Sequence, residues 1–402
     1  MASLRLEAQA RVILGLNILY NIADSLCSVF VGVYFYSNAV NATPIYQHYF
    51  WLLNACALTF VLAGWYAQVK DRVHVLRLGL FIQAIVYGIV LYLRESAVDY
   101  AIPLGILLGI GLGSYYAGTN TLHFDATTKD KRSYFLGWMN AGTGAARFIG
   151  PVFAGKLINV IPEWGYECVF FTAVVLYLAA FLFSFRVHDD GVHRPYLLGY
   201  AVNPFKMHRD WCWFMGSSFF VAGSYMLIPL LLSLLMFVET ENAFYVGVFM
   251  GVQSIVNILV SYAVGRWMQS HHRKATMFWS SVAIALAGGL ILVHWSITTL
   301  IVFSLIRAVA MPLFQVPYIS YKFDIIDRVM PQPGHRIEFI VAWELPLWLG
   351  RFFFCLFLIY SAGELEAFDV RVCLFLLCAQ RLLAHWCTIQ TDVVRESLLR
   401  AA

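Results

Sequence analysis

Polar residues recur on one face of the first long apolar segment of the chain. Asn17, Asn21 and Asp24 follow one another at spacings of four and three residues within that segment. Residues at these spacings share one face of an α-helix. Amides on such a face can bind a polar ligand, and a carboxylate in an apolar setting can take up and release a proton. We expect this face to line a polar cavity.

Arginines and a second carboxylate also lie inside long apolar segments. The arginines are Arg147, Arg307 and Arg351, and Glu344 precedes Arg351 by seven residues on the same helical face. Charged residues in such segments usually mark a functional site. We expect these residues and Asp24 to form a central cluster with net positive charge. A planar guanidinium binds carboxylate or phosphate through paired hydrogen bonds, so the cluster favours an anionic or zwitterionic ligand.

The same charges could instead form salt bridges between helices, and we assign that structural role to Arg381. Other polar side chains could bind the ligand or hold helices together. The ligand-binding candidates among them are Tyr115, Tyr116, Asn120, Asn140, Gln253, Asn257 and Gln315. The eight cysteines lie in apolar segments without Cys-x-x-Cys spacing, and no phosphate-binding loop of the Walker type occurs. We expect no metal, no cofactor and no use of ATP.

The composition indicates a membrane protein. Of 402 residues, 61% are hydrophobic and 12% are charged, whereas soluble domains have about 25% charged residues. Soluble enzymes, nucleic-acid-binding proteins and disordered chains are therefore excluded. A helix needs about 20 apolar residues to cross a bilayer, so we expect an all-α protein with twelve spans. They lie at 11–36, 45–68, 76–93, 101–122, 134–158, 164–185, 211–237, 243–268, 275–294, 298–321, 338–360 and 368–388.

Basic residues predict the orientation of these spans. Most lysines and arginines lie in loops that are cytoplasmic if the N-terminus is inside. We therefore expect both termini in the cytoplasm and an integral protein of a bacterial inner membrane. The longest connection, 186–210, is charged and indicates a cytoplasmic linker between two six-helix bundles, 1–185 and 211–402.

The two halves repeat short patterns. Arg147 in the fifth span and Arg351 in the eleventh are each followed by phenylalanine, 204 residues apart. A Gly-x3-Gln-x3-Arg pattern follows the second span and the eighth. These registers indicate duplication of a six-helix unit. The pattern residues are Gly64, Gln68 and Arg72 in the first half and Gly265, Gln269 and Arg273 in the second.

These features resemble the major facilitator superfamily over essentially the whole chain. The first pattern resembles the family's loop motif between helices two and three, with Gln68 where the family has an aspartate and Asp71 nearby out of register. Span five resembles the motif of the family's antiporters through Gly137, Ala146, Gly150, Pro151, Ala154 and Gly155. The resemblance implies rocker-switch alternating access, with gating roles for the loop-pattern residues, Asp71, Gly150 and Pro151. Within the family, the overall pattern resembles the YqgE-type branch.

The resulting hypothesis is a secondary transporter, not an enzyme, that carries out proton-coupled export of a small anionic or zwitterionic organic solute. Asp24 and Glu344 are its proton-coupling candidates. Asn17, Asn21 and the intramembrane arginines other than Arg381 join the ligand-binding candidates. Two alternatives stay open: a multidrug-type exporter of lipophilic cations, with Asp24 or Glu344 as the counter-charge, and a lipid or glycolipid flippase. A non-transporting receptor is disfavoured, since no large extramembrane segment is present. We expect a monomer that interacts with the bilayer and not with nucleic acid.

Overall fold

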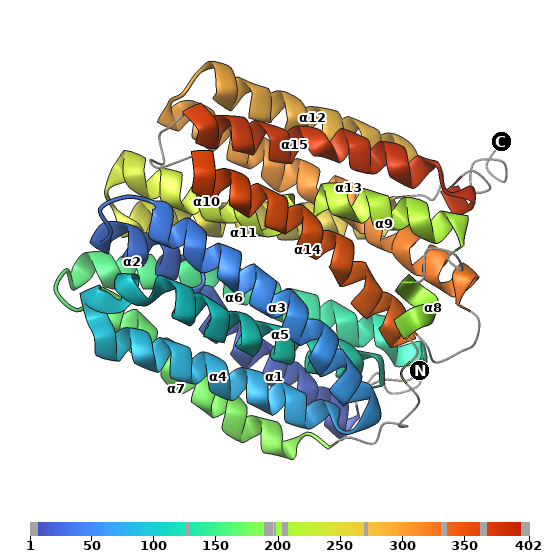
Figure 1. Cartoon of the computed structure of the whole chain (residues 1–402), viewed down its shortest axis with the longest axis horizontal. Helices are drawn as coiled ribbons and strands as arrows, with labels where there is room; N and C mark the ends of the chain where they lie inside the picture. The colour runs from blue at the N-terminus through green and yellow to red at the C-terminus, as the bar shows by residue number, and fades with distance from the viewer. Residues whose placement is uncertain are drawn as a thin grey trace. The chain divides into compact units, whose positions relative to one another are not determined.

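The apolar runs of the sequence form long helices (Figure 1). The structure is a computed structural model and describes residues 7–125, 129–188, 196, 198–202, 208–268, 272–330, 336–361 and 368–394. Within these ranges, all regular structure is helical and no β-strand occurs. Helices satisfy their own backbone hydrogen bonds, which a bilayer core requires because it offers no water.

Each expected span corresponds to a helix or to a pair of consecutive helices. The first span is the pair α1 (Ala8–Cys27) and α2 (Phe30–Asn38), and the seventh is the pair α9 (Arg209–Val221) and α10 (Gly223–Thr240). The remaining helices of the first half are α3 (Thr43–Val69), α4 (Arg72–Leu93), α5 (Ala101–Asp125), α6 (Lys129–Val160) and α7 (Gly165–Phe183). Those of the second half are α8 (Leu198–Val202), α11 (Ala243–Trp267), α12 (Arg273–Val293), α13 (Ile297–Val329), α14 (Arg336–Ser361) and α15 (Phe368–Ile389).

Within the described residues, ten helical segments are long and apolar enough to cross a membrane. One of them, Arg72–Asn120, contains α4 and most of α5, with the short 3-10 helix η1 (Arg94–Tyr100) between them. These segments therefore account for every expected span except the fifth. That span is α6, whose charged and small residues lower its hydropathy. The prediction of an all-α membrane protein is confirmed.

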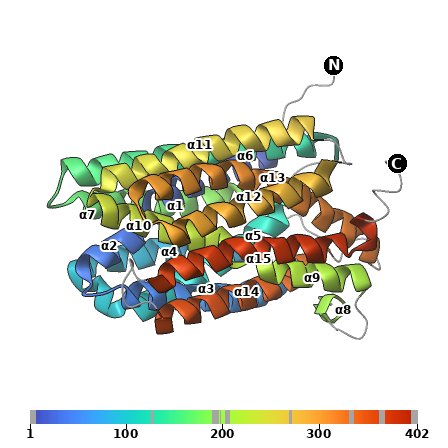
Figure 2. The same ribbon diagram turned by 90° about the horizontal axis from the view of Figure 1, so that it is seen from above.

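The chain divides into two compact units. The first contains Met1–Tyr196 and Thr240–Val252, and the second contains Leu197–Glu239 and Gln253–Ala402. In the first unit, α5 packs between α3 and α4 (Figure 1), and α1 packs against α6 and α7. In the second, α9 runs alongside α15 (Figure 2) and also contacts α14. The packing of spans one, five and six thus recurs among spans seven, eleven and twelve, as expected for an internal repeat.

Glycines allow α5 to approach its neighbours closely. Gly105, Gly109 and Gly113 form one face of α5, and a Cβ on any of them would collide with a backbone carbonyl oxygen of α3. Toward α4, a Cβ on Gly118 would collide with the side chain of Leu76. Small residues favour helix association in a bilayer, because lipid gives little hydrophobic drive and close van der Waals contact must supply the energy.

Aromatic side chains form the core of the second unit. Trp211 and Phe214 of α9 pack with Phe314 and Tyr318 of α13 in one buried cluster. The indole Nε1 of Trp211 donates to the carbonyl oxygen of Ala201 at 2.9 Å. This bond attaches the short helix α8 to the start of α9.

Candidate functional site

The polar face predicted for the first span is present on α1 and is bonded to α6. Nδ2 of Asn21 donates to the carbonyl oxygen of Asn17 at 2.7 Å and to its Oδ1 at 3.1 Å. The hydroxyl of Thr143 in α6 donates to the same Oδ1 at 3.3 Å. Both asparagines are buried. Their amide groups therefore bond to each other, and Asn17 also bonds to α6.

Asp24 lies one turn further along α1 and is half-buried. Among the described residues, its carboxylate forms neither a hydrogen bond nor an ion pair. Arg147 of α6 is exposed, and its positive charge acts on Asp24. A carboxylate that is near a guanidinium without being fixed to it can change protonation when the distance between them changes.

Tyrosines form a wall beside this polar face. Tyr20 of α1 stacks on Tyr115 of α5 with ring centroids 3.5 Å apart, and its ring meets Tyr116 edge-on at 6.5 Å. Tyr115 is buried, whereas Tyr116 is exposed. Tyr20 is absent from the sequence-based candidates because nothing in its spacing distinguished it from the other tyrosines. A small pocket beside the wall is lined by Ile13, Leu16, Asn17, Leu76, Tyr115, Thr119 and Leu122. Two ligand-binding candidates, Asn17 and Tyr115, thus share one pocket.

Gly150 and Pro151 mediate close contacts of α6 on two sides. A Cβ on Gly150 would collide with the side chain of Ser25, so this glycine lets α1 approach α6. A Cβ on Gly247 in α11 would collide with the carbonyl oxygen of Pro151. In the first unit, the span-five motif therefore packs against α1 and against the start of α11.

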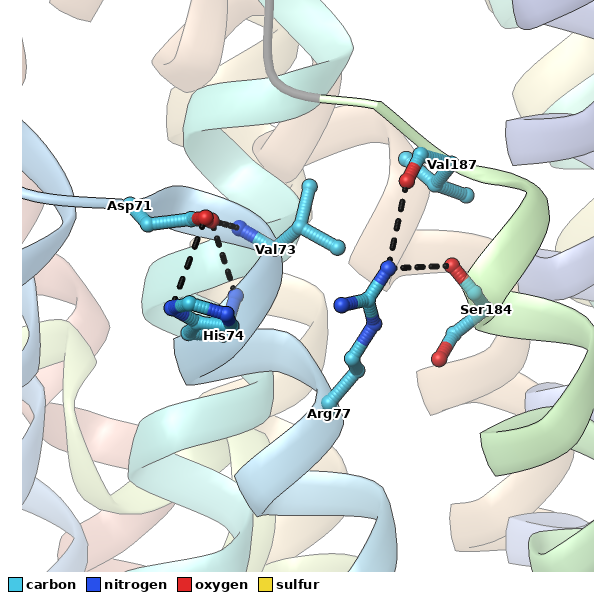
Figure 3. Close-up of polar contacts among 6 residues, drawn as sticks. All are labelled: Asp71, Val73, His74, Arg77, Ser184 and Val187. Carbon is cyan, nitrogen blue, oxygen red and sulfur yellow. Dashed lines mark hydrogen bonds and ion pairs between the residues drawn. The ribbon is translucent and has the colours of Figure 1, made fainter.

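Asp71 caps the helix that follows the first Gly-x3-Gln-x3-Arg pattern (Figure 3). Its Oδ1 accepts hydrogen bonds from the backbone amides of Val73 at 2.6 Å and His74 at 2.9 Å. Its Oδ2 lies 3.4 Å from the His74 ring. The gating candidates Gly64 and Gln68 are buried at the end of α3, just before this cap. The carboxylate of Asp71 thus has a structural role at the start of α4.

Arg77 in the same region binds the segment that follows α7. Arg77 donates to the carbonyl oxygens of Ser184 and Val187, each at 3.3 Å (Figure 3). Its guanidinium also lies 4.4 Å from the Phe185 ring centroid. Arg72, a gating candidate, is buried at the start of α4. These contacts fix α4 to the chain that leaves α7.

Glu344 and Arg351 pair within α14. Nη1 of Arg351 donates to Oε1 of Glu344 at 2.5 Å, and the side chains are 13% and 17% exposed, respectively. Their spacing of two helical turns predicts the shared face. Of the expected central cluster, the structure thus brings together Glu344 with Arg351 in the second unit, and Asp24 with Arg147 in the first.

A buried lysine joins Glu344 although the sequence did not single it out. Lys322 of α13 is 8% exposed, its Nζ lies 3.8 Å from the Trp343 ring centroid, and its charge acts on Glu344. Nε1 of Trp343 donates to Oγ of Ser218 at 2.8 Å. Lysines at helix ends commonly extend to the membrane surface, so the position of Lys322 in the sequence gave no sign of its burial.

Arg307 and Arg381 reach the same residue of α10. Nη2 of Arg307 donates to the carbonyl oxygen of Ser224 at 3.4 Å, and Nη2 of Arg381 donates to its Oγ at 2.7 Å. Both arginines are buried. Neither forms an ion pair with any described residue. Sequence analysis assigned ligand binding to Arg307 and a structural role to Arg381, whereas the structure places the two side chains together at Ser224.

The other sequence-based candidates lie on several helices. Arg273 forms an ion pair with Asp324 at 3.6 Å and thereby links α12 to α13. Gln269 lies outside the described residues. Gln253 is buried, Asn120, Asn257 and Gln315 are half-buried, and Asn140 and Gly265 are exposed.

Comparisons with known proteins agree with this helical architecture. The sequence profile of the Major Facilitator Superfamily matches residues 14–329. The protein YqgE of Bacillus subtilis (strain 168) is 30% identical over 334 residues, which are 83% of this chain and 78% of that protein. The cis,cis-muconate transport protein of Acinetobacter baylyi (strain ATCC 33305 / BD413 / ADP1) is 27% identical over 137 residues, which are 34% of this chain and 32% of that protein.

A solved structure shares the fold. The solved structure of a bacterial homologue of the human drug peptide transporters PepT1 and PepT2 superposes with a TM-score of 0.70 over 98% of this chain and 99% of that chain. Its sequence identity is 12%, so the similarity concerns the fold alone.

Proposed function

Since this chain belongs to the major facilitator superfamily, as a transporter of the YqgE type, we propose that it exports a small organic anion or zwitterion in exchange for protons. It acts as a monomer in a bacterial inner membrane, with both termini in the cytoplasm. Two bundles, 1–185 and 211–402, are joined by the linker 186–210. Together they expose the solute-binding site alternately to the two sides of the membrane.

The observation that carries the anion proposal is an excess of guanidinium charge within the spans. Glu344 neutralises Arg351 through their ion pair, and Asp24 is the carboxylate near Arg147. Arg307 is buried and forms no ion pair with any described residue. A buried unpaired charge is costly, so a carboxylate of the solute would supply the missing negative charge.

Sequence similarity supports an organic acid as the solute. The Acinetobacter relative is named for the transport of cis,cis-muconate, a dicarboxylate, and about a third of this chain resembles it. The resemblance of span five to the antiporter motif, at Gly150 and Pro151, favours exchange over uptake. Asp24 is the preferred proton carrier because it is not fixed in an ion pair.

Binding to the purified protein tests the class of solute. Thermal shifts are measured at pH 6 and pH 8 with cis,cis-muconate, succinate and benzoate, and with the lipophilic cation tetraphenylphosphonium. We expect stabilisation by at least one acid that is lost in Arg147→Ala and Arg307→Ala. Lys156→Ala, which removes an exposed charge from the same helix as Arg147, is the matched control and should retain the shift.

Proteoliposomes then test transport and separate the rival functions. An outward proton gradient should drive uptake of the stabilising acid into the vesicles, since the acid exchanges for protons. Stabilisation by tetraphenylphosphonium alone, lost in Asp24→Asn, would instead assign the chain to multidrug-type exporters.

A further inference from the structure

Arg307 and Arg381 come from different helices, α13 and α15, and meet at one residue. The 2.7 Å bond from Arg381 to Oγ of Ser224 and the 3.4 Å bond from Arg307 to its carbonyl oxygen place both guanidinium groups at the start of α10. Their positive charges act on each other. Like charges repel strongly in an interior of low polarity, so this arrangement is unfavourable by itself.

Several buried hydrogen-bond donors of the pair have no acceptor among the described residues. A guanidinium has five N–H donors. Nε and Nη1 of Arg381 and Nε of Arg307 are buried and have no acceptor among the described residues. Buried charges normally have a partner of opposite charge, because desolvation is otherwise uncompensated. These donors therefore point to a missing anion.

Aromatic rings hold Arg381 in place. Its guanidinium carbon lies 4.9 Å from the ring centroid of Phe314 and 5.8 Å from that of Tyr225. Such cation–π contacts engage the flat face of the group, whereas its hydrogen bonds extend from the edge. An edge with two N–H donors matches the two oxygens of a carboxylate.

We propose that Arg307, Arg381 and Ser224 form a subsite for a carboxylate group of the transported solute. Arg381 is then a substrate-binding residue and not a structural one. The inference rests on the proposed transport of organic anions and locates where the negative group binds. Arg351 does not compete for this role, since Glu344 already neutralises it.

Acid and amide pairs test the subsite directly. Calorimetry measures the affinity of the wild type for cis,cis-muconate, succinate and benzoate, and for the corresponding amides. We expect at least one acid to bind, its amide to bind at least tenfold more weakly, and Arg381→Gln and Arg307→Gln to lose at least tenfold in affinity for the acid. Arg381→Lys keeps the charge but loses the paired donors, so it should also bind at least tenfold more weakly.

The matched control is Arg371→Gln. Arg371 is on the same helix, where it contacts the rings of Trp295 and Phe368 at 5.9 Å and 5.7 Å. This variant should bind the acid as the wild type does.

Stability without solute separates a binding role from a structural one. Replacement of uncompensated buried charge by an apolar side chain often stabilises a protein. Arg381→Met should therefore unfold at the same or a higher temperature than the wild type without solute, and should gain no stability from the acid. A lower unfolding temperature together with unchanged acid affinity would make Arg381 structural and overturn the subsite. Where Arg381→Met does not fold, the affinity of Arg381→Lys decides.

The remaining outcomes distinguish this inference from the proposed function. If no acid binds the wild type, the transport proposal fails and the subsite fails with it. If acids bind the wild type and the Arg381 variants equally, the transport proposal stands and the subsite is overturned. Stabilisation by sodium chloride alone, lost in Arg381→Gln, would make this an inorganic anion site and would also overturn the inference.

Discussion

Glu344 and Arg351 form an ion pair of 2.5 Å along a single helix, α14. Because both residues belong to one element, the pair can persist when helices move relative to one another. Asp24 and Arg147 differ, since they lie on α1 and α6 and form no ion pair among the described residues. Movement between these two helices would change their separation. The contrast makes Asp24 the better candidate for proton coupling and Glu344 the better candidate for fixing Arg351.

Asp24→Asn should separate exchange from proton movement. An amide cannot take up the proton. Exchange of solute for solute without a proton gradient should therefore continue, whereas proton movement driven by the solute should be lost. Transport by the wild type should vary between pH 6 and pH 8, and transport by the variant should not. A pH-sensitive dye in proteoliposomes measures the proton flux. Glu95→Gln, which changes an exposed carboxylate of η1, is the control, and proton flux that persists in Asp24→Asn would refute the assignment.

Glu344→Gln should lower stability by about 1–3 kcal/mol, because the half-buried Arg351 would lose its partner charge. Thermal unfolding in detergent measures the effect. The double variant Glu344→Gln with Arg351→Gln should be less destabilised than the sum of the single variants, since the pair is removed as a unit. Additive effects would show that the two side chains contribute independently.

Gly109→Ala should destabilise the first unit by about 1–3 kcal/mol through overpacking. The new Cβ would collide with the carbonyl oxygen of Leu52, which belongs to the backbone of α3 and cannot rotate away. Gly88→Ala on α4 is a matched control, because no atom lies within 4 Å of its added Cβ. The control should be neutral or slightly stabilising, and equal unfolding temperatures for both variants would contradict the close contact.

Variants of Asp71 distinguish a role in capping α4 from a role in gating. Asp71→Ala should cost about 0.5–2 kcal/mol, whereas Asp71→Asn should be nearly neutral because asparagine caps helices as well as aspartate does. Unfolding temperatures and transport rates are measured for both. Impaired transport by a stable Asp71→Asn protein would show that the charge acts in gating beyond its role as a cap.

Sequence reasoning located most of the helices well because hydropathy selects them. The spans predicted at 45–68 and 243–268 correspond to α3 (Thr43–Val69) and α11 (Ala243–Trp267). The interruption between α1 and α2 was not predicted, and neither was that between α9 and α10. Both breaks fall inside a single apolar segment, Ala8–Asn38 or Arg209–Thr240, that is long enough to be one membrane span.

The candidate site was only partly predictable. Asn17 and Asn21 lie on one face as their spacing requires, and their hydrogen bond follows from that spacing. The spacing of Glu344 and Arg351 likewise placed them together. The burial of Lys322 over Trp343 and the stacking of Tyr20 on Tyr115 were missed, because each depends on how two different helices pack against each other.

The sequence by itself determined the membrane class, the helical spans, the internal repeat and the residues that share a helical face. These properties follow from local periodicity and from the need of a bilayer for self-satisfied helices. Only the tertiary structure decided which charges meet. It placed Arg381 beside Arg307 at Ser224 and left both without a carboxylate among the described residues. Which charged side chains meet depends on the rotation of each helix about its axis. Packing against neighbouring helices sets that rotation.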